Sequence, residues 1–411
     1  MKILHFADAH IDMANYGRHD PDSGLPLRVL DFLKSLDVII DTAISERVDL
    51  VLFAGDAYKD RSPSPTYQRE WGRRIIRLSQ ARIPTLLLIG NHDLSPAIGR
   101  ANAVQEFDTL QIPFVKVISR IQRLTPSELW DLPLQVVALP WITRSALLAE
   151  PDFENLPKES LIDVMEKYTV DQVRTLLEQT DSSLLSIFLA HASVEGAQYG
   201  NERTIMLGSD MTLPSSLVKD PRWDYVALGH IHKAQNLNER SHPPVIYPGS
   251  IERVDFGEAG DRKCFVIAEI ERGASQVSWR NLDDVRPFLD CGVTLNDPDL
   301  VTEMIRSSLP SQAEMEGAIL RLTVTYPREM ESLIDEPSIR KLAERAFEFH
   351  LVRKPQTSLR SRLSPNQMAS SLSPLDLLDQ YWQVNQIQVD EELRNLARQI
   401  IEDEPGGDTP T

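Results

Sequence analysis

The feature that most constrains the fold is a series of short apolar runs, each followed by polar side chains. The clearest run is Thr85–Ile89, which leads directly into Gly90-Asn91-His92-Asp93. An apolar run of this length is typical of a buried strand. In open α/β sheets the ligand crevice lies where parallel strands give way to loops. Asparagine, aspartate and glycine also make ordinary turns, so this stretch alone is only suggestive.

Strands and helices alternate along the first hundred residues. We expect strands at 3–6, 50–53 and 85–89, and helices at 27–43, 67–78 and 98–110, where apolar residues recur at helical spacing. This βαβαβα order predicts a parallel sheet. Further apolar runs predict strands at 136–139, 185–189, 225–228, 245–247 and 264–270.

Beyond this α/β part the pattern changes. Residues 144–183 resemble an insertion that is acidic and then helical. Strands near 288, at 318–324 and at 348–352, with helices at 301–308 and 338–347, predict a small α+β domain. We therefore expect domains at 1–278 and 279–355, a Ser/Pro-rich linker at 356–372, paired helices at 373–404 and a disordered tail at 405–411. Ser373-Pro374 supplies an N-cap and a first-turn proline for the first tail helix.

Charge and composition restrict the class of protein. The net charge of −18 argues against a surface that generally coats DNA. Residues 1–120 are balanced, with fifteen basic and fifteen acidic side chains, whereas residues 364–411 carry two basic and nine acidic ones. No apolar run approaches the roughly 20 residues of a membrane span, and the N-terminus lacks the apolar core of a signal peptide. The expected location is the cytoplasm, with no membrane partner, and Cys264 and Cys291 predict neither a disulfide framework nor a thiolate metal site.

Eight side chains with metal-binding or catalytic chemistry follow the predicted strands. They are Asp8, His10, Asp56, Asn91, His92, His191, His230 and His232. Each motif alone could be a turn, but five separate segments ending in such groups point to one site. Carboxylate, imidazole and amide ligands without thiolate suit Mn²⁺, Fe²⁺ or Zn²⁺. Seven of these residues, all except His92, are candidate ligands, which is more than one ion needs. We therefore expect two ions about 3.5–4 Å apart that activate water for phosphoryl displacement.

The same motifs resemble the calcineurin-like metallophosphoesterase superfamily. Several further stretches are similar to the SbcD family of nuclease subunits for DNA double-strand-break repair. They are Ala138-Leu139-Pro140-Trp141, Tyr247-Pro248-Gly249-Ser250-Ile251-Glu252-Arg253 and Asp255-Phe256-Gly257-Glu258. The resemblance implies a layered β-sheet sandwich flanked by helices, a small α+β capping domain and a C-terminal helical tail.

The resemblance also implies roles for individual residues. One Mn²⁺ would be held by Asp8, His10, Asp56 and His232. The other would be held by Asp56, Asn91, His191 and His230, with Asp56 as the bridge. His92 would be the catalytic histidine. Fe²⁺, Mg²⁺ or Zn²⁺ could replace Mn²⁺. The implied activities are 3′→5′ exonuclease cleavage of double strands and endonuclease cleavage of hairpins and single strands.

The implied partners are DNA, an SbcC-type coiled-coil ATPase and a second copy of the chain, which together would form a heterotetramer. Helices at 66–78 and 98–110 would form the dimer contact. Apolar residues of the tail would bind the ATPase, because two short amphipathic helices cannot bury their faces alone. These residues are Leu375, Leu378, Tyr381, Trp382, Leu393, Leu396 and Ile400.

One position departs from the family pattern. Where many archaeal and eukaryotic members have a histidine after the Gly-Asp motif, this chain has Lys59. An exonuclease-specific role of that histidine is therefore in doubt. Lys59 could contact a phosphate instead, and Arg18, His19 and Arg61 are further candidates for DNA contacts.

Two other interpretations fit the same ligands. A phosphatase or phosphodiesterase for a small molecule would share every metal ligand, but it would not explain the additional domain or the apolar tail helices. A scaffold that binds DNA ends would make the chemistry incidental. The chain has no Gly-x4-Gly-Lys-Ser/Thr phosphate loop, so any ATPase activity would come from another polypeptide.

Overall fold

The computed structural model describes residues 1–16, 18–94, 101–143, 161–200 and 211–356, together with residues 375, 378, 379, 382, 393–396 and 398. The chain divides into two compact units. The first comprises Met1–Asp290, Pro310–Arg321 and Ala343–His350, and the second comprises Cys291–Leu309, Leu322–Leu342 and Leu351–Thr411. The linker predicted at 356–372 lies outside the described residues, apart from its first residue, and the domain boundaries drawn from sequence stay predictions.

The first sheet has the strand order β14-β13-β1-β2-β3-β4. Its strands are β1 (Lys2–Phe6), β2 (Leu50–Phe53), β3 (Thr85–Leu88), β4 (Val115–Ile118), β13 (Cys264–Glu269) and β14 (Gln276–Asn281). The four strands from β1 to β4 are parallel, as the βαβ alternation predicts. β13 pairs antiparallel with β1, which brings a late segment of the chain beside the first strand.

The second sheet has the strand order β11-β12-β10-β7-β6-β5. Its strands are β5 (Gln122–Leu124), β6 (Leu134–Leu139), β7 (Leu185–His191), β10 (Tyr225–Gly229), β11 (Gln235–Asn236) and β12 (Val245–Tyr247). β6, β7, β10 and β12 are parallel, so their carboxyl ends lie at one edge. β8 (Ser193–Val194) and β9 (Thr212–Leu213) pair separately.

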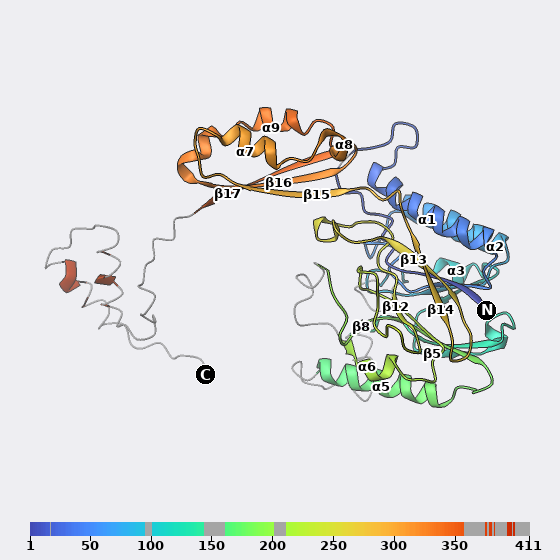
Figure 1. The fold of residues 1–411 in the computed structure, drawn as a ribbon. Coiled ribbons are helices and arrows are strands. Elements are labelled where there is room, and N and C mark those ends of the chain that lie inside the picture. The colour runs from blue at the N-terminus through green and yellow to red at the C-terminus, as the bar shows by residue number, and fades with distance from the viewer. Residues whose placement is uncertain are drawn as a thin grey trace. The chain divides into compact units, whose positions relative to one another are not determined.

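The two sheets pack face to face, with helices on both outer faces. Alternate residues of β1 show this, since Ile3 belongs to the cluster between the sheets and Leu4 to the cluster under the helices. Helices α1 (Leu27–Ser45) and α2 (Pro65–Gln80) lie side by side over the first sheet (Figure 1). Helices α5 (Leu161–Glu178) and α6 (Ser215–Val218) contribute to the cluster on the outer face of the second sheet. This layered sandwich confirms the fold class.

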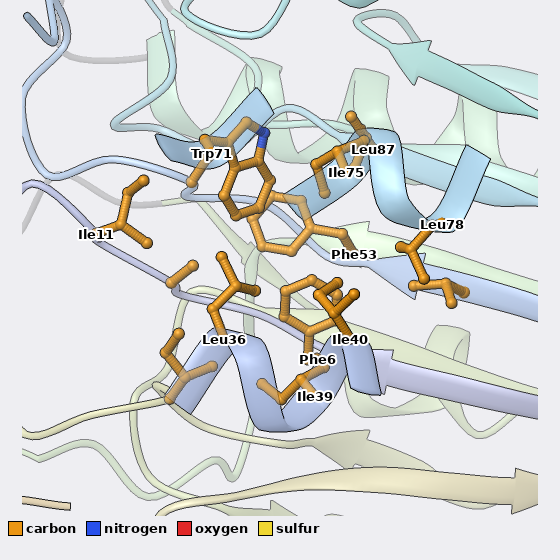
Figure 2. Packing of buried hydrophobic residues seen from close by; sticks show 14 of the residues in the cluster. Phe6, Ile11, Leu36, Ile39, Ile40, Phe53, Trp71, Ile75, Leu78 and Leu87 are labelled. Carbon is orange, nitrogen blue, oxygen red and sulfur yellow. The ribbon is translucent and has the colours of Figure 1, made fainter. Parts of the chain in front are cut away.

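Aromatic packing fixes α2 on the first sheet. Trp71 is fully buried and lies 5.0 Å, centroid to centroid, from Phe53, which lies 4.9 Å from Phe6. Figure 2 shows these rings meeting Leu36 and Ile40 of α1. Burying a large side chain of this kind contributes about 1.5–3 kcal/mol to the stability of the fold. This packing therefore stabilises the first sheet, whose strands β1 and β2 end at the site described below.

The remaining elements are short. They are α3 (Glu106–Thr109), α7 (Val301–Ser308), α8 (Gln312–Met315), α9 (Glu336–Leu342), and the 3₁₀ turns η1 (Pro126–Glu128), η5 (Phe256–Glu258) and η6 (Arg328–Leu333). Strands β15 (Phe288–Thr294), β16 (Ile319–Pro327) and β17 (Glu348–Gln356) form a three-stranded sheet in that order. None of the helices formed by the described residues is long and apolar enough to cross a bilayer.

Two helix predictions were wrong in extent. The helix expected at 98–110 is only α3 among the described residues, because the Asn102 side chain accepts a hydrogen bond from Val104 N (3.2 Å) and favours a turn. The helix expected at 338–347 ends at Leu342, because Phe347 N donates to Ala318 O (2.8 Å) and begins strand pairing.

Candidate metal centre

The predicted site residues come together at the carboxyl ends of the parallel strands of both sheets. Asp8 and His10 follow β1, Asp56 follows β2, and Asn91 and His92 follow β3. His191 ends β7, and His230 and His232 follow β10. Two groups of ligand atoms lie within 4.8 Å of one another, namely Asp8, His10 and His232, and Asp8, Asp56 and His191. All of the side chains in these two groups are buried.

His10 and His232 are arranged as a pair of metal ligands would be. His10 donates its Nδ1 proton to the Tyr58 carbonyl (3.2 Å), and His232 donates its Nδ1 proton to Glu258 Oε1 (2.7 Å). Each neutral ring therefore carries a lone pair at Nε2, and these two atoms are 3.1 Å apart. Two lone pairs facing each other in a buried site repel, and a shared cation would remove that repulsion.

A second group of acceptors surrounds Asn91. His191 donates its Nδ1 proton to the Ala54 carbonyl (2.6 Å). Its Nε2 donates to Asn91 Oδ1 (2.9 Å), so a metal ion bound there would replace the proton on Nε2. His230 Nδ1 is 3.1 Å from the same amide oxygen. An amide oxygen and imidazole nitrogens at this spacing are a suitable ligand set for a second divalent ion.

Asp56 lies between the two groups. Its Oδ1 accepts from the backbone of His92 (2.8 Å), whereas Oδ2 is 3.9 Å from His10 Nε2 and 3.5 Å from His191 Nε2. This oxygen therefore faces both groups, and its role as a bridge between two ions stays a prediction. Asp8 also faces both groups, and both of its oxygens accept from His230 N at 3.1 Å.

The pKa values of Asp8, Asp56 and His191 indicate that the site favours positive charge. Burial raises the pKa of Asp8 to about 6, although His232 and His191 lower it. Burial would likewise raise the pKa of Asp56, but the neighbouring His191 holds it well below its usual range. Burial would lower the pKa of His191, yet Asp56 raises it to about 9. A bound divalent ion would supply the charge that this proton provides, so the residues fit a metal pair.

The backbone at the site is strained in the way that functional sites often are. Asp8, His10, Asp56 and His230 have φ of 50°, 38°, 65° and 102°, in the left-handed region that is unfavourable for these residues. Close packing requires Gly90, because a Cβ there would lie 2.1 Å from Asp56 Oδ1. The strand ends are therefore held in conformations that aim their side chains at one point.

Two supporting carboxylates were not assigned a role from sequence. Asp93 accepts backbone hydrogen bonds from Asp56, Ala57 and Gly90 (2.9 Å each) and so ties the end of β2 to the end of β3. Glu258 accepts a hydrogen bond from His232 Nδ1 and so fixes the orientation of that ring. Both residues stand in motifs recognised from sequence, but nothing in the spacing shows which backbone or ring they contact. Trp141, from another of these motifs, lies 4.8 Å from His230, centroid to centroid.

His92 lies beside the metal ligands without belonging to either group. Its Nδ1 donates to the Lys59 carbonyl (2.8 Å), so its Nε2 carries the lone pair, and its ring meets that of His10 edge-on at 5.2 Å. Burial lowers the pKa of His92; Asp56 raises it and Lys59 lowers it. An imidazole held in one tautomer next to a metal pair can exchange a proton with a reacting oxygen.

The other predicted contacts are exposed or half-buried. Arg18 and His19 lie in the loop after β1, where Arg18 Nε is 3.9 Å from Glu348 Oε2, and Lys59 and Arg61 lie in the loop after β2. In the tail, Leu375, Leu378, Trp382, Leu393 and Leu396 are helical, whereas Tyr381 and Ile400 lie outside the described residues. Leu393 and Leu396 are 40% and 52% exposed.

Comparison with known proteins matches residues 1–234 to the family described as calcineurin-like phosphoesterase. The chain is 25% identical over 281 residues to the SbcD component of the nuclease SbcCD of Escherichia coli K12, which covers 66% of each protein. It is 26% identical over 261 residues to the DNA double-strand break repair protein Mre11 of Archaeoglobus fulgidus, which covers 63% of this chain and 52% of that protein. The chain thus spans just under two thirds of the first relative's length and about half of the second's.

Among solved structures, a dimetal phosphatase from Danio rerio aligns with a TM-score of 0.38 and 12% identity, covering 68% of this chain and 96% of that one. The family match extends over more than half of the chain and includes all of the predicted metal-site residues. The chain therefore belongs to the calcineurin-like phosphoesterase family, as a metallophosphoesterase with SbcD and Mre11 nucleases among its homologues.

Proposed function

We propose that this protein is a two-metal DNA nuclease, the nuclease component of an SbcCD-type complex that processes DNA ends. The observation that carries the proposal is the convergence of two carboxylates, an amide and four imidazoles from five strand ends, with His92 beside them. The relatives named as a component of SbcCD and as a DNA double-strand break repair protein favour DNA over a small substrate.

Each side chain has a part in this mechanism. A bound pair of ions, preferably Mn²⁺ and alternatively Fe²⁺, Mg²⁺ or Zn²⁺, would activate water and stabilise the charge of an in-line phosphoryl displacement. Asp8, His10, Asp56 and His232 would hold one ion. Asp56, Asn91, His191 and His230 would hold the other.

His92 would act on the leaving group. The Lys59 carbonyl fixes the ring proton at Nδ1, so Nε2 is the atom that meets the scissile phosphate. When protonated, Nε2 can donate a proton to the leaving oxygen or stabilise charge on it. Lys59, whose charge acts on His92, would contact the DNA backbone together with Arg18, His19 and Arg61.

The proposed activities are 3′→5′ exonuclease cleavage of duplex ends and endonuclease cleavage of hairpins and single strands. The chain would work in the cytoplasm as a dimer bound to a coiled-coil ATPase. The tail helices are the proposed ATPase contact, because the described part of their apolar face is exposed at Leu393 and Leu396.

Replacing His92 tests the chemistry directly. We expect Mn²⁺-dependent degradation of linear and hairpin-ended duplexes by the wild type. His92→Ala should lower the cleavage rate by roughly 10²–10⁴-fold, the usual contribution of a general acid or base. Manganese binding should persist, because the ring of His92 is not a ligand. The assay measures labelled DNA fragments, with a chelated sample as the control. Efficient hydrolysis of a cyclic nucleotide with no cleavage of DNA would contradict the proposal.

A further inference from the structure

A buried ion pair, Glu258 and Lys263, contacts His232, one of the proposed metal ligands. Glu258 Oε1 accepts from His232 Nδ1 (2.7 Å), and Glu258 Oε2 accepts from Lys263 Nζ (2.7 Å). Glu258 and Lys263 are 3% and 2% exposed. A buried ion pair usually adds little stability, since removing both charges from water offsets their attraction. A gain in stability therefore does not explain why Glu258 and Lys263 are buried beside His232.

The carboxylate of Glu258 is locked in one orientation. Its Oε2 accepts from Lys263 Nζ and from the backbone of Val254 (2.9 Å). Lys263 also donates to Ser250 Oγ (2.7 Å), and the Ser250 hydroxyl donates to the Glu252 carbonyl (3.0 Å). With Oε2 held by two donors, only Oε1 faces the metal site. Glu258 can then act on His232 but cannot rotate to become a ligand itself.

His232 differs from its neighbours in this contact. His10 and His191 donate their Nδ1 protons to the neutral carbonyls of Tyr58 and Ala54. His232 donates to an ionised carboxylate, which fixes the tautomer and makes the ring a stronger ligand. The histidine ligands of the two proposed ions therefore differ in their hydrogen-bond acceptors. Of the two ions, the one bound by His232 has a ligand whose ring donates its Nδ1 proton to a carboxylate.

We infer that Glu258, oriented by Lys263, is a positioning residue that sets the affinity of one ion of the pair, the ion bound by Asp8, His10, Asp56 and His232. This inference deepens the proposed function and rests on its metal assignment. The ligand is a divalent cation, and Mn²⁺ alone is the probe. Glu258 touches neither substrate nor ion, so it acts only through His232.

The amide variant Glu258→Gln gives the sharpest test. Lys263 and Val254 N both donate toward one terminal atom of residue 258, so the amide oxygen should turn toward them and its NH₂ toward His232. The ring must then accept at Nδ1 and carry its proton at Nε2, where it blocks metal binding. We expect calorimetric Mn²⁺ titration to show one site weakened by roughly 10–100-fold. The other site should change far less.

A double variant separates this effect from misfolding. Glu258→Gln leaves the Lys263 ammonium buried without a carboxylate, which is destabilising, whereas Glu258→Gln with Lys263→Met removes both charges. The double variant should recover thermal stability. Its Mn²⁺ affinity at the site that includes His232 should stay reduced, because Val254 N still donates toward the same terminal atom and keeps the amide oxygen there.

Glu252→Gln is the matched control. Glu252 is fully buried and accepts from the backbone of Arg253 (2.7 Å) and Arg286 (3.2 Å), neither of which is a metal ligand. The substitution should affect the melting temperature and leave both Mn²⁺ affinities unchanged. The inference is overturned if folded Glu258→Gln binds both ions like the wild type, or if both sites weaken equally in Glu258→Gln and Glu252→Gln. A wild type that binds no pair of Mn²⁺ ions would overturn the proposed function as well.

Discussion

At the residue scale, the side chains that gather at the candidate metal centre could be predicted, and the residues that support them could not. A polar side chain that follows an apolar run is visible in one dimension, which is why Asp8, Asn91 and His230 were identified from sequence. Glu258 meets His232 across 26 positions of chain without any periodic signal. The role of Asp93 was equally hidden, because its partners are backbone amides that nearly every residue carries.

His5 gives a pH prediction for stability. It is fully buried between the sheets, 3.1 Å from the Tyr225 hydroxyl, and burial lowers its pKa from 6.5 to about 3, against a backbone hydrogen bond with Leu228. Between these values only the unfolded chain binds the proton, so stability falls as pH drops below 6.5. From pH 7 to pH 5 the loss due to His5 is about 2 kcal/mol.

The variant His5→Gln removes this proton uptake. Urea unfolding at pH 7 and pH 5 should show that the variant loses less stability on acidification than the wild type, by about 2 kcal/mol. Taking the difference between the two proteins cancels the contributions of Asp8 and the other acids. An equal loss of stability in both proteins would mean that the pKa of His5 is the same in the folded and unfolded chains, which would contradict the prediction.

At the scale of elements, strong patterns predicted strands and helices well and weak patterns did not. β2 and β3 are continuous apolar runs and were predicted closely, as were α1 and α2 from their apolar stripes. The edge strand β14 was not predicted, because its side chains alternate between half-buried and exposed and form no apolar run. The predicted helix at 98–110 was wrong where Asn102 makes a turn instead.

The junction of β2 and β3 depends on Asp93. Replacing it with asparagine turns one acceptor oxygen into an NH₂ group that faces the backbone amides of Asp56, Ala57 or Gly90. We expect Asp93→Asn to cost roughly 1–3 kcal/mol of unfolding free energy, the usual penalty for an unsatisfied buried donor. It should also weaken Mn²⁺ binding, because Asp56 shifts with its backbone.

Urea unfolding in the presence of a chelator measures the stability effect of Asp93→Asn without contributions from metal. Asp108→Asn is a suitable control, since Asp108 is an exposed carboxylate on α3. Equal effects of the two substitutions would show that the three backbone hydrogen bonds do not hold the junction.

At the scale of the whole molecule, the sequence pattern predicted a parallel sheet and two tail helices beyond a linker, and the family resemblance implied the layered sandwich. The layered order of the sheets follows from apolar residues on both faces of the strands, since such strands need cover on each side. Strand order could not be derived in the same way. That β13 lies beside β1 depends on pairing across most of the chain, which no local pattern encodes.

The tail supports a prediction about assembly. Deleting residues 373–404 should leave the nuclease activity on short DNA and the melting temperature of the remaining chain close to those of the full chain. Binding to a coiled-coil ATPase should be lost, because the apolar face that includes Leu393 and Leu396 is removed. A pull-down with the purified ATPase measures this, and undiminished capture by the truncated chain would assign the contact elsewhere.

The central claim is that residues from distant strand ends hold two ions with Asp56 between them. The most direct measurement is anomalous diffraction from a crystal soaked in Mn²⁺. We predict two peaks about 3.5–4 Å apart, one beside His10 and His232 and one beside Asn91 and His191, with Asp56 Oδ2 in contact with both. A single peak, or Asp56 turned away from both ions, would contradict the two-metal centre.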